Sequence, residues 1–204
     1  RMMGPFLRKP LEAFQHDKKL IMYGMKQMYT PKMPSRFSFL FTVMMNGYAR
    51  TLLTGLCNRL DWYLPRWMYF SGSCFFVRKT MFEAVGLFDE NVFMYGEEDD
   101  IHYRLSRKFG NHFRYDPSIR YLHLMLGRAP SISYEKKLLE VDLYHHEKKG
   151  WPIQRTLRTY LHTNNVLLAR CYLRKIWGKC DEENFAVLKA LRKEITTRIK
   201  DLKE

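Results

Sequence analysis

Apolar side chains recur with helical spacing over the second half of the chain. Ile101, Leu105 and Phe109 repeat every four positions and predict a helix that ends at Gly110. Two further helices are predicted within residues 155–177 and 182–203. The last of them carries an apolar stripe on an otherwise charged helix, made of Phe185, Leu188, Leu191, Ile195 and Ile199.

Strand patterns alternate with these helices in the middle of the chain. Residues 67–79, WMYFSGSCFFVRK, are rich in aromatic and small side chains and predict a buried strand. A short helix follows and should stop near Gly86. Residues 112–124 alternate as a strand that places Ile119, Tyr121 and His123 on one face. This alternation of strands and helices indicates an α/β class of fold.

The first part of the chain gives a different pattern. Glycine and proline interrupt residues 1–36, which predicts irregular structure there. Residues 37–62 are typical of a helix, but Asn46 and Arg50 interrupt the apolar run, which is too short for a membrane span. Two interpretations stay open for this segment, a core helix and a helix lying on a membrane surface.

Charge and composition narrow the classes of partner. The 204 residues, 46% of them hydrophobic, are enough for one domain or most of a larger one, and the net charge is +14. The excess of lysine and arginine lies in residues 1–50 and 151–204. Basic ends suit nucleic acid, phosphorylated substrates or anionic lipid equally well. The four cysteines show no CxxC spacing and are typical of reduced thiols in a cytosolic protein.

Four consecutive carboxylates, Glu97 to Asp100, open the predicted helix that ends at Gly110. Like charges at this spacing raise one another's pKa values, while the positive end of a helix dipole stabilises them. A fold tolerates such a cluster when a cationic group lies nearby or when the chemistry needs a poised carboxylate. The alternative is an ordinary solvated helix cap.

Three stretches around this cluster, taken together, resemble an inverting glycosyltransferase of family 2 with the GT-A fold. They are SGSCFFVRKTMFEAVGLFDE (71–90), FMYGEEDDIHYRL (93–105) and DPSIRYLHL (116–124). The resemblance covers about residues 67–125 and is similar in style to rhamnosyltransferase-like members that build bacterial polysaccharides. It implies that residues 1–150 form the acceptor-side portion of a GT-A domain, with a mixed sheet flanked by helices. Residues 151–204 would be a helical extension.

The resemblance also assigns roles to residues. Glu97 and Glu98 match the family's Glu-Asp pair, whose second member deprotonates the acceptor hydroxyl. The implied base is therefore Glu98, whose side chain is one methylene longer than that of Asp. Asp99 is the alternative base. The implied acceptor-binding residues are Gly72, Asp89, Glu90, Asp100 and Arg104. His123 matches a histidine that ligates a divalent metal in some members.

The resemblance also implies a metal ion, substrates and a cellular location. The resemblance predicts Mn²⁺ or Mg²⁺, a nucleotide-sugar donor and a saccharide or lipid-linked acceptor. It predicts a cytoplasmic location, with peripheral contact at the inner face of the membrane as a further expectation, and no nucleic-acid partner. The chain shows no Asp-x-Asp outside the acidic cluster and no glycine-rich phosphate loop. A donor-binding half is therefore expected upstream of Arg1.

Structural interpretations remain beside these roles. His123 is as well explained by a core position as by a metal site, and Arg104 by an ion pair with Asp100 at i, i+4. Asp89 and Glu90 could be loop residues, and His145 and His146 are predicted at the surface. At the level of the whole chain, the alternatives are a non-catalytic basic module that binds nucleic acid or an anionic membrane, and oligomerisation through the C-terminal helices.

Overall fold

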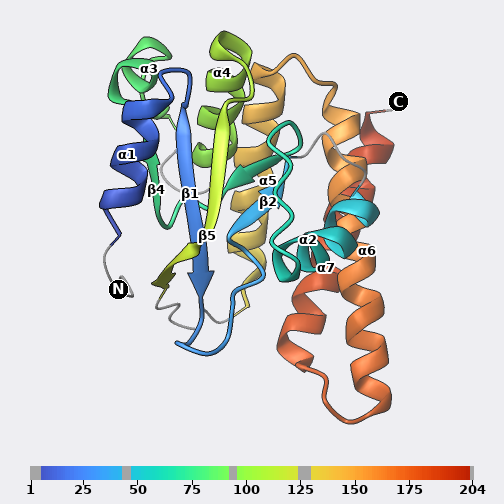
Figure 1. Cartoon of the computed structure of the whole chain (residues 1–204). Helices are drawn as coiled ribbons and strands as arrows, with labels where there is room; N and C mark the ends of the chain where they lie inside the picture. The colour runs from blue at the N-terminus through green and yellow to red at the C-terminus, as the bar shows by residue number, and fades with distance from the viewer. Residues whose placement is uncertain (1–5, 43–46, 92–95, 124–129, 203–204) are drawn as a thin grey trace. The chain divides into compact units, whose positions relative to one another are not determined.

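The computed structural model describes residues 6–42, 47–91, 96–123 and 130–202. The chain divides into two compact units, the first built from residues 1–42 and 53–126 and the second from 43–52 and 127–204. Both units are visible in Figure 1. The second unit begins before residue 151, the predicted start of the helical extension, because the preceding helix α5 (Ile132–Lys148) packs on the two helices that follow it. The division of the chain at residue 150 stays a prediction.

The first unit is built on a mixed sheet. Its strand order is β4 (Phe75–Val77), β1 (Met22–Met28) and β5 (Phe113–Leu122). The central strand β1 runs antiparallel to β4 and parallel to β5. Parallel pairing places the carboxyl ends of β1 and β5 at one edge of the sheet, where Met28 lies beside Leu122. The expected α/β class is confirmed.

A second, two-stranded sheet pairs β2 (Phe39–Phe41) with β3 (Met68–Phe70). The helices of the first unit are α1 (Arg8–His16), α3 (Lys79–Ala84) and α4 (Glu97–Phe109). Helix α2 (Gly47–Arg59) begins in the second unit and ends in the first. None of the helices in the described ranges has the length and apolarity that crossing a membrane requires.

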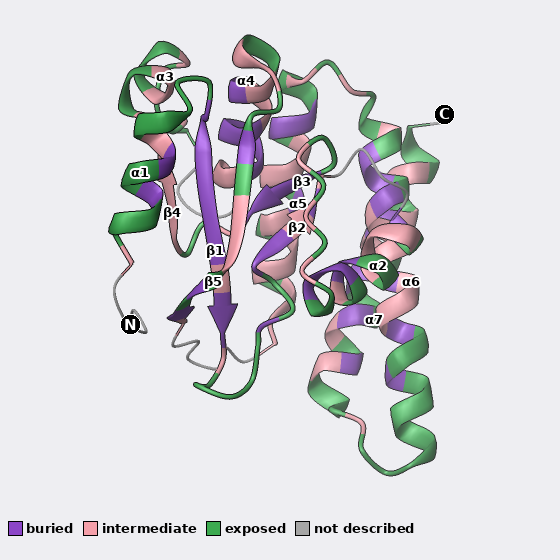
Figure 2. Cartoon of the chain, viewed as in Figure 1, coloured by how far each residue is buried: buried purple, intermediate pink, exposed green. Residues whose placement is uncertain are grey.

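The prediction of irregular structure over residues 1–36 was wrong, because this segment holds both α1 and β1. Strand β1 is buried almost throughout, as Figure 2 shows, so its sequence MYGMKQM does not alternate between apolar and polar residues. Gly24 is a residue type that often interrupts strands, but here it allows the Phe70 ring to approach the backbone. A Cβ at this position would lie 2.3 Å from that ring. Pro10 is tolerated because it lies in the first turn of α1.

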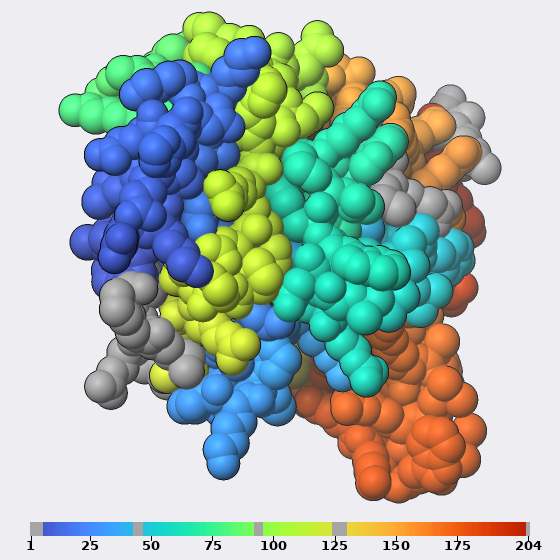
Figure 3. Space-filling model, viewed as in Figure 1, coloured from blue at the N-terminus to red at the C-terminus, as the bar shows by residue number. Residues whose placement is uncertain are grey.

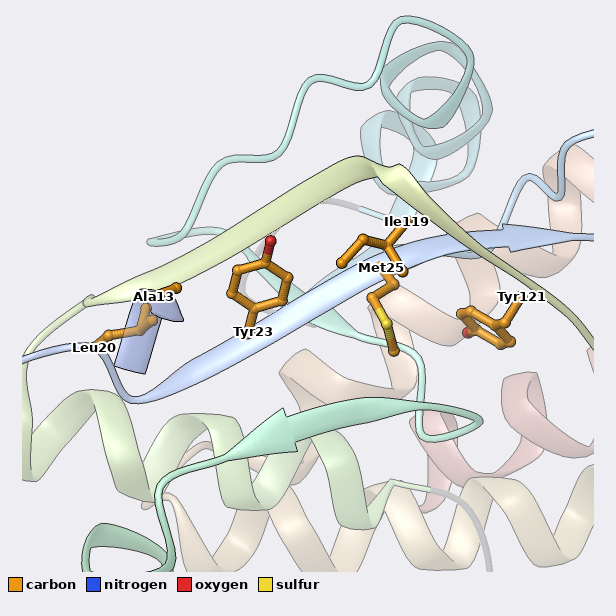
Figure 4. Close-up of a cluster of buried hydrophobic side chains, with 6 residues drawn as sticks. All are labelled: Ala13, Leu20, Tyr23, Met25, Ile119 and Tyr121. Atoms are coloured by element: carbon orange, nitrogen blue, oxygen red, sulfur yellow. The ribbon is translucent and has the colours of Figure 1, made fainter. Parts of the chain in front are cut away.

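The core of this unit joins α1 to both parallel strands. Figure 4 shows six buried side chains of this cluster: Ala13, Leu20, Tyr23, Met25, Ile119 and Tyr121. Arg78 holds the end of α1 by donating hydrogen bonds to the backbone oxygens of Phe14, Asp17 and Leu20. This cluster fixes β1 and β5 as a rigid support for the edge where their carboxyl ends meet.

Two further segments differ from their predicted form. Residues 37–62 begin with strand β2, and the helix starts only at Gly47. Asn58 joins the two, since its Oδ1 accepts from the Ser38 backbone N–H at 2.8 Å and its Nδ2 donates to the Phe39 oxygen at 2.9 Å. Residues 67–79 form two strands, β3 and β4, that belong to different sheets. The turn between them carries Gly72, which was predicted to lie in one continuous strand.

The second unit contains α5, α6 (Ile153–Ile176) and α7 (Glu182–Asp201), which pack on one another. Both predicted C-terminal helices are confirmed, while α5 was not predicted. The predicted surface positions of His145 and His146 were wrong, because both are about 1% exposed. Each lies on the inner side of α5, and the His146 Nδ1 is 2.8 Å from the Thr156 hydroxyl of α6.

Candidate active site at the start of helix α4

A left-handed glycine sets the start of α4. Gly96 has φ of 83°, and its oxygen accepts the first helical hydrogen bond, from the Asp100 N–H at 3.0 Å. Few residues other than glycine adopt this backbone conformation without strain. All four carboxylates therefore lie in the first turn, where the helix dipole favours negative charge, as predicted.

The cluster divides into two kinds of carboxylate. Asp99 and Asp100 are buried, at 6% and 1% exposure, whereas Glu97 and Glu98 are half-buried. A cap that is simply solvated would leave its carboxylates in water. The burial of this first turn therefore argues against the solvated-cap interpretation.

Asp100 and Arg104 form a structural link. The Arg104 guanidinium donates to Asp100 Oδ2 at 2.7 and 2.8 Å, and it also donates to the backbone oxygens of Val85 and Leu87. The ion pair expected at i, i+4 is present. It ties the turn after α3 to α4 and so positions the acidic cluster. Binding of an acceptor by these two residues stays a prediction.

Glu98 faces the turn that follows β3. The Gly72 backbone N–H donates to Glu98 Oε1 at 3.3 Å. Glu98 Oε2 and Glu97 Oε2 are buried from solvent and have no hydrogen-bond partner among the described residues. The structure thus brings together two predicted positions, Gly72 and Glu98, that are 26 residues apart. Among the described residues, Glu98 Oε2 accepts no hydrogen bond.

Three polar side chains that the sequence reasoning missed connect this turn to the sheet. The Ser73 hydroxyl lies 2.6 Å from the Tyr121 hydroxyl and donates to Gln27 Oε1 at 3.1 Å. Burial raises the pKa of Tyr121 to about 12, so its hydroxyl stays protonated. The sequence feature that could have indicated this network is Gln27, a polar residue in a strand that is otherwise mostly apolar. Through these contacts, the turn at Gly72 is held at the carboxyl ends of β1 and β5.

The electrostatics at Glu98 suit proton transfer near neutral pH. Burial raises its pKa to about 7, and the negative charges of Glu97 and Asp99 act in the same direction. The hydrogen bonds from its own backbone N–H and that of Gly72 oppose this rise. A carboxyl group with this pKa is divided between its two protonation states at pH 7, as an efficient general base requires.

Three other predicted site residues, Asp89, Glu90 and His123, lie in loops or just after a strand. Asp89 Oδ1 accepts hydrogen bonds from the backbone and side chain of Asn91, as in a loop turn, and Glu90 is exposed. His123 follows β5 at the same sheet edge as Gln27, half-buried, and its backbone N–H donates to the Met28 oxygen at 3.1 Å.

A metal centre is not built by the described part of the chain. No group of three or more His, Cys, Asp or Glu side chains there is arranged to hold an ion. These residues therefore do not fit a divalent cation by themselves. His123 as a ligand, and Mn²⁺ or Mg²⁺ as the ion, stay predictions.

The closeness of Gly72 to Glu98 leads to a prediction. A Cβ at residue 72 would lie 3.3 to 3.4 Å from the Glu98 carboxyl atoms, tighter than most such contacts. Gly72→Ala should therefore weaken the 3.3 Å hydrogen bond, further exclude water and raise the pKa of Glu98 above about 7. The measurement is an NMR titration of ¹³C-labelled glutamate carboxyl groups, with Glu98→Gln to assign the signal.

The control for this titration is Gly55→Ala, where the nearest atom to the new Cβ is 4.0 Å away. That variant should leave the Glu98 midpoint unchanged. A midpoint in Gly72→Ala equal to that of the unmodified protein would show that the backbone contact does not govern this carboxyl group.

Comparison with known proteins adds a partial relationship. The chain matches no protein-family model and no solved structure. Over 114 residues it is 36% identical to N-acetylglucosaminyl-diphospho-decaprenol L-rhamnosyltransferase of Mycobacterium tuberculosis, in strains CDC 1551 and H37Rv. The match covers 52% of this chain and 37% of each relative, so the chain spans little more than a third of the length of these curated relatives. Half of this chain is thus similar to part of a glycosyltransferase that carries this name.

Proposed function

We propose that this chain is the acceptor-side part of an inverting GT-A glycosyltransferase of family 2, with Glu98 as general base. The substrates would be a nucleotide-sugar, of L-rhamnose or a hexose, and a saccharide or lipid-linked acceptor used for bacterial surface polysaccharide. One observation carries the proposal: the half-buried Glu98 carboxyl group lies in the first turn of α4 and accepts the Gly72 N–H, in surroundings whose burial raises its pKa. The similarity to a rhamnosyltransferase supports the class of reaction.

The geometry suggests how the chain would act on an acceptor. A sugar hydroxyl is a weak nucleophile and needs a base at hydrogen-bonding distance. Glu98 Oε2 would accept the hydroxyl proton as the acceptor oxygen bonds to the anomeric carbon. The bond from that carbon to the diphosphate oxygen breaks on the opposite face, and its electron pair leaves with the nucleoside diphosphate. Attack opposite the leaving group inverts the anomeric configuration.

Neighbouring groups would support this step. The Gly72 N–H orients the Glu98 carboxylate, and Arg104 fixes the helix turn beneath it. The charge of Glu97 keeps the pKa of Glu98 high, which makes the carboxylate a stronger base once ionised. A cytoplasmic location, with contact at the inner membrane face, belongs to the same proposal.

The test is the pH dependence of transfer by the full-length protein that contains this chain. Labelled L-rhamnose from its nucleotide-sugar should appear in a lipid-linked N-acetylglucosaminyl acceptor. Because Glu98 must be ionised to act as base, kcat/KM should rise about tenfold per pH unit below about pH 7 and level off above it. Transfer with a flat profile from about pH 5 to pH 8 would exclude Glu98 as the base. No transfer with any nucleotide-sugar would favour the non-catalytic binding module.

A further inference from the structure

The end of the hairpin formed by α6 and α7 exposes large apolar side chains. Tyr172 and Leu173 are 54% and 53% exposed, and Ile176 and Trp177 are 74% and 69% exposed. Their spacing places them on one face of the last two turns of α6. Figure 3 shows the orange end of α6 at the molecular surface. Isolated exposed apolar residues are ordinary, whereas several large ones gathered on one face are typical of an interaction surface.

This end of the hairpin is a folded element. Cys171 and Phe185 belong to a buried cluster beneath the exposed face, and the Tyr172 ring meets Phe185 edge-on at 4.9 Å. The turn is closed by the Gly178 N–H, which donates to the Lys175 oxygen at 3.0 Å. Asp181 then caps α7 by accepting from the Asn184 N–H. The apolar face is therefore presented on a rigid support.

A basic groove adjoins the apolar face. It has a volume of about 800 Å³, is lined only by residues of α6 and α7, and includes Tyr172. Its charged lining residues are all cationic: Lys189, Arg192, Lys193 and Lys200. None of these four forms an ion pair within the described residues, and Arg192 donates to the Asn165 amide oxygen. The groove thus presents uncompensated positive charge.

The two features lie at a spacing that fits a bilayer surface. Arg192 contacts Asn165, which lies eleven residues before Ile176 on α6. At the rise of an α-helix, this places Arg192 about 16 Å from Ile176, while the other end of the groove, at Tyr172, adjoins the apolar face. Interfacial helices bury apolar side chains about 5–10 Å into the boundary of headgroups and acyl chains. With the tip at that depth, the end of the groove next to Tyr172 lies at the lipid phosphates and Arg192 lies just above them, within reach of flexible lysine side chains.

We propose that the end of the α6–α7 hairpin docks on an anionic bilayer, with Leu173, Ile176 and Trp177 inserted and the basic groove on the lipid phosphates. The exposed aliphatic residues favour a lipid partner over nucleic acid, which binds exposed aromatics by stacking. The positive groove favours an anionic partner over a second, equally basic copy of this chain. At the tip, Glu182 is already paired with Lys175 at 2.9 Å.

The consequence of docking rests on the proposed function, because only a transferase with a lipid-linked acceptor gains from being held at the membrane. The docking itself is tested without nucleotide-sugar. Co-sedimentation of the 204-residue chain is measured with vesicles of phosphatidylcholine alone and with about a third phosphatidylglycerol. The two measurements are therefore independent: absent vesicle binding would contradict the docking without testing the sugar transfer, and absent transfer would contradict the proposed function without testing the docking.

Two variants separate the contributions of the groove and the tip. Lys189→Gln with Lys193→Gln should lower partitioning into anionic vesicles roughly 30-fold, since each lysine near such a surface contributes about fivefold. The matched control, Lys18→Gln with Lys19→Gln, removes the same charge from exposed residues near α1 and should lower it less than threefold. Ile176→Ser with Trp177→Ser should lower it at least tenfold. All of these residues are exposed, so circular dichroism and melting temperature should not change.

The same set of measurements can overturn the proposal. Absent vesicle binding, or binding that neither the groove variant nor the tip variant reduces, contradicts it. A dimer in sedimentation equilibrium that Ile176→Ser with Trp177→Ser dissociates, without vesicle binding, would assign the tip to a second copy. Retention of single-stranded DNA that the groove variant abolishes, again without vesicle binding, would assign the groove to nucleic acid.

Discussion

Glu98→Gln should reduce sugar transfer by the full-length protein about 10²- to 10⁴-fold while the fold stays intact. The amide keeps the size of the side chain and can still accept the Gly72 N–H, but it cannot take a proton from the acceptor hydroxyl. The measurement is kcat for transfer at about pH 8, where the carboxylate of the unmodified protein is ionised. Glu83→Gln, the same change at an exposed residue of α3, is the control and should retain full activity.

The same variant has a second readout in stability. The folded-state pKa of Glu98, about 7, lies above the ordinary value of 4.5, so the folded protein holds this proton more tightly than the unfolded chain. The contribution of Glu98 to stability is therefore greatest at low pH and is lost as the pH rises from about 4.5 to about 7.

Glu98→Gln removes the free-energy cost of ionising this buried carboxyl group. It should raise the free energy of unfolding by about 2 to 3 kcal/mol above pH 7 and change it little below about pH 4.5. Urea titrations at both pH values measure the difference. Full transfer activity in Glu98→Gln would remove Glu98 as the base. Equal stability of both proteins at high pH would show that Glu98 is not a buried carboxyl group with a raised pKa.

Arg104→Met should lower the free energy of unfolding by about 3 to 5 kcal/mol. The substitution removes the ion pair to Asp100, a carboxylate only 1% exposed, and the hydrogen bonds to the backbone oxygens of Val85 and Leu87. Breaking a buried pair costs more than the pair contributes, since a buried charge loses its compensation. Urea unfolding followed by circular dichroism gives the change.

Arg107→Met is the matched control for this prediction. It removes the same charge from an exposed residue of the same helix and should cost less than 1 kcal/mol. Replacing Asp100 by Leu together with Arg104→Met should recover part of the loss, because no buried charge then remains at this pair. An Arg104→Met variant as stable as Arg107→Met would mean that the link between α4 and the turn after α3 does not support the fold.

Local sequence signals determined much of the acidic site. Gly96 and Gly110 bound a helix whose first turn is acidic, and Ile101 and Leu105 form its buried face. These features depend on residues within a few positions of one another, which is why spacing alone predicted them. The resemblance named Gly72 and Glu98 separately, as an acceptor-binding residue and as the base, and the structure places them in contact.

Tertiary contacts decided the rest. Gly24 had the form of a breaker, yet it lies in the central strand because the Phe70 ring occupies the space where a Cβ would be. His145 and His146 matched no motif and were predicted at the surface, yet both are buried in the second unit, where His146 meets Thr156 of α6. The support that Gln27 and Tyr121 give to the turn at Ser73 joins residues up to 94 positions apart. At the acidic cluster and in the two C-terminal helices, the chain by itself determined where a helix forms, because capping residues and helical spacing act locally. The burial of Glu98 depends on distant segments that exclude water from its carboxyl group. Tertiary structure therefore also decided its pKa.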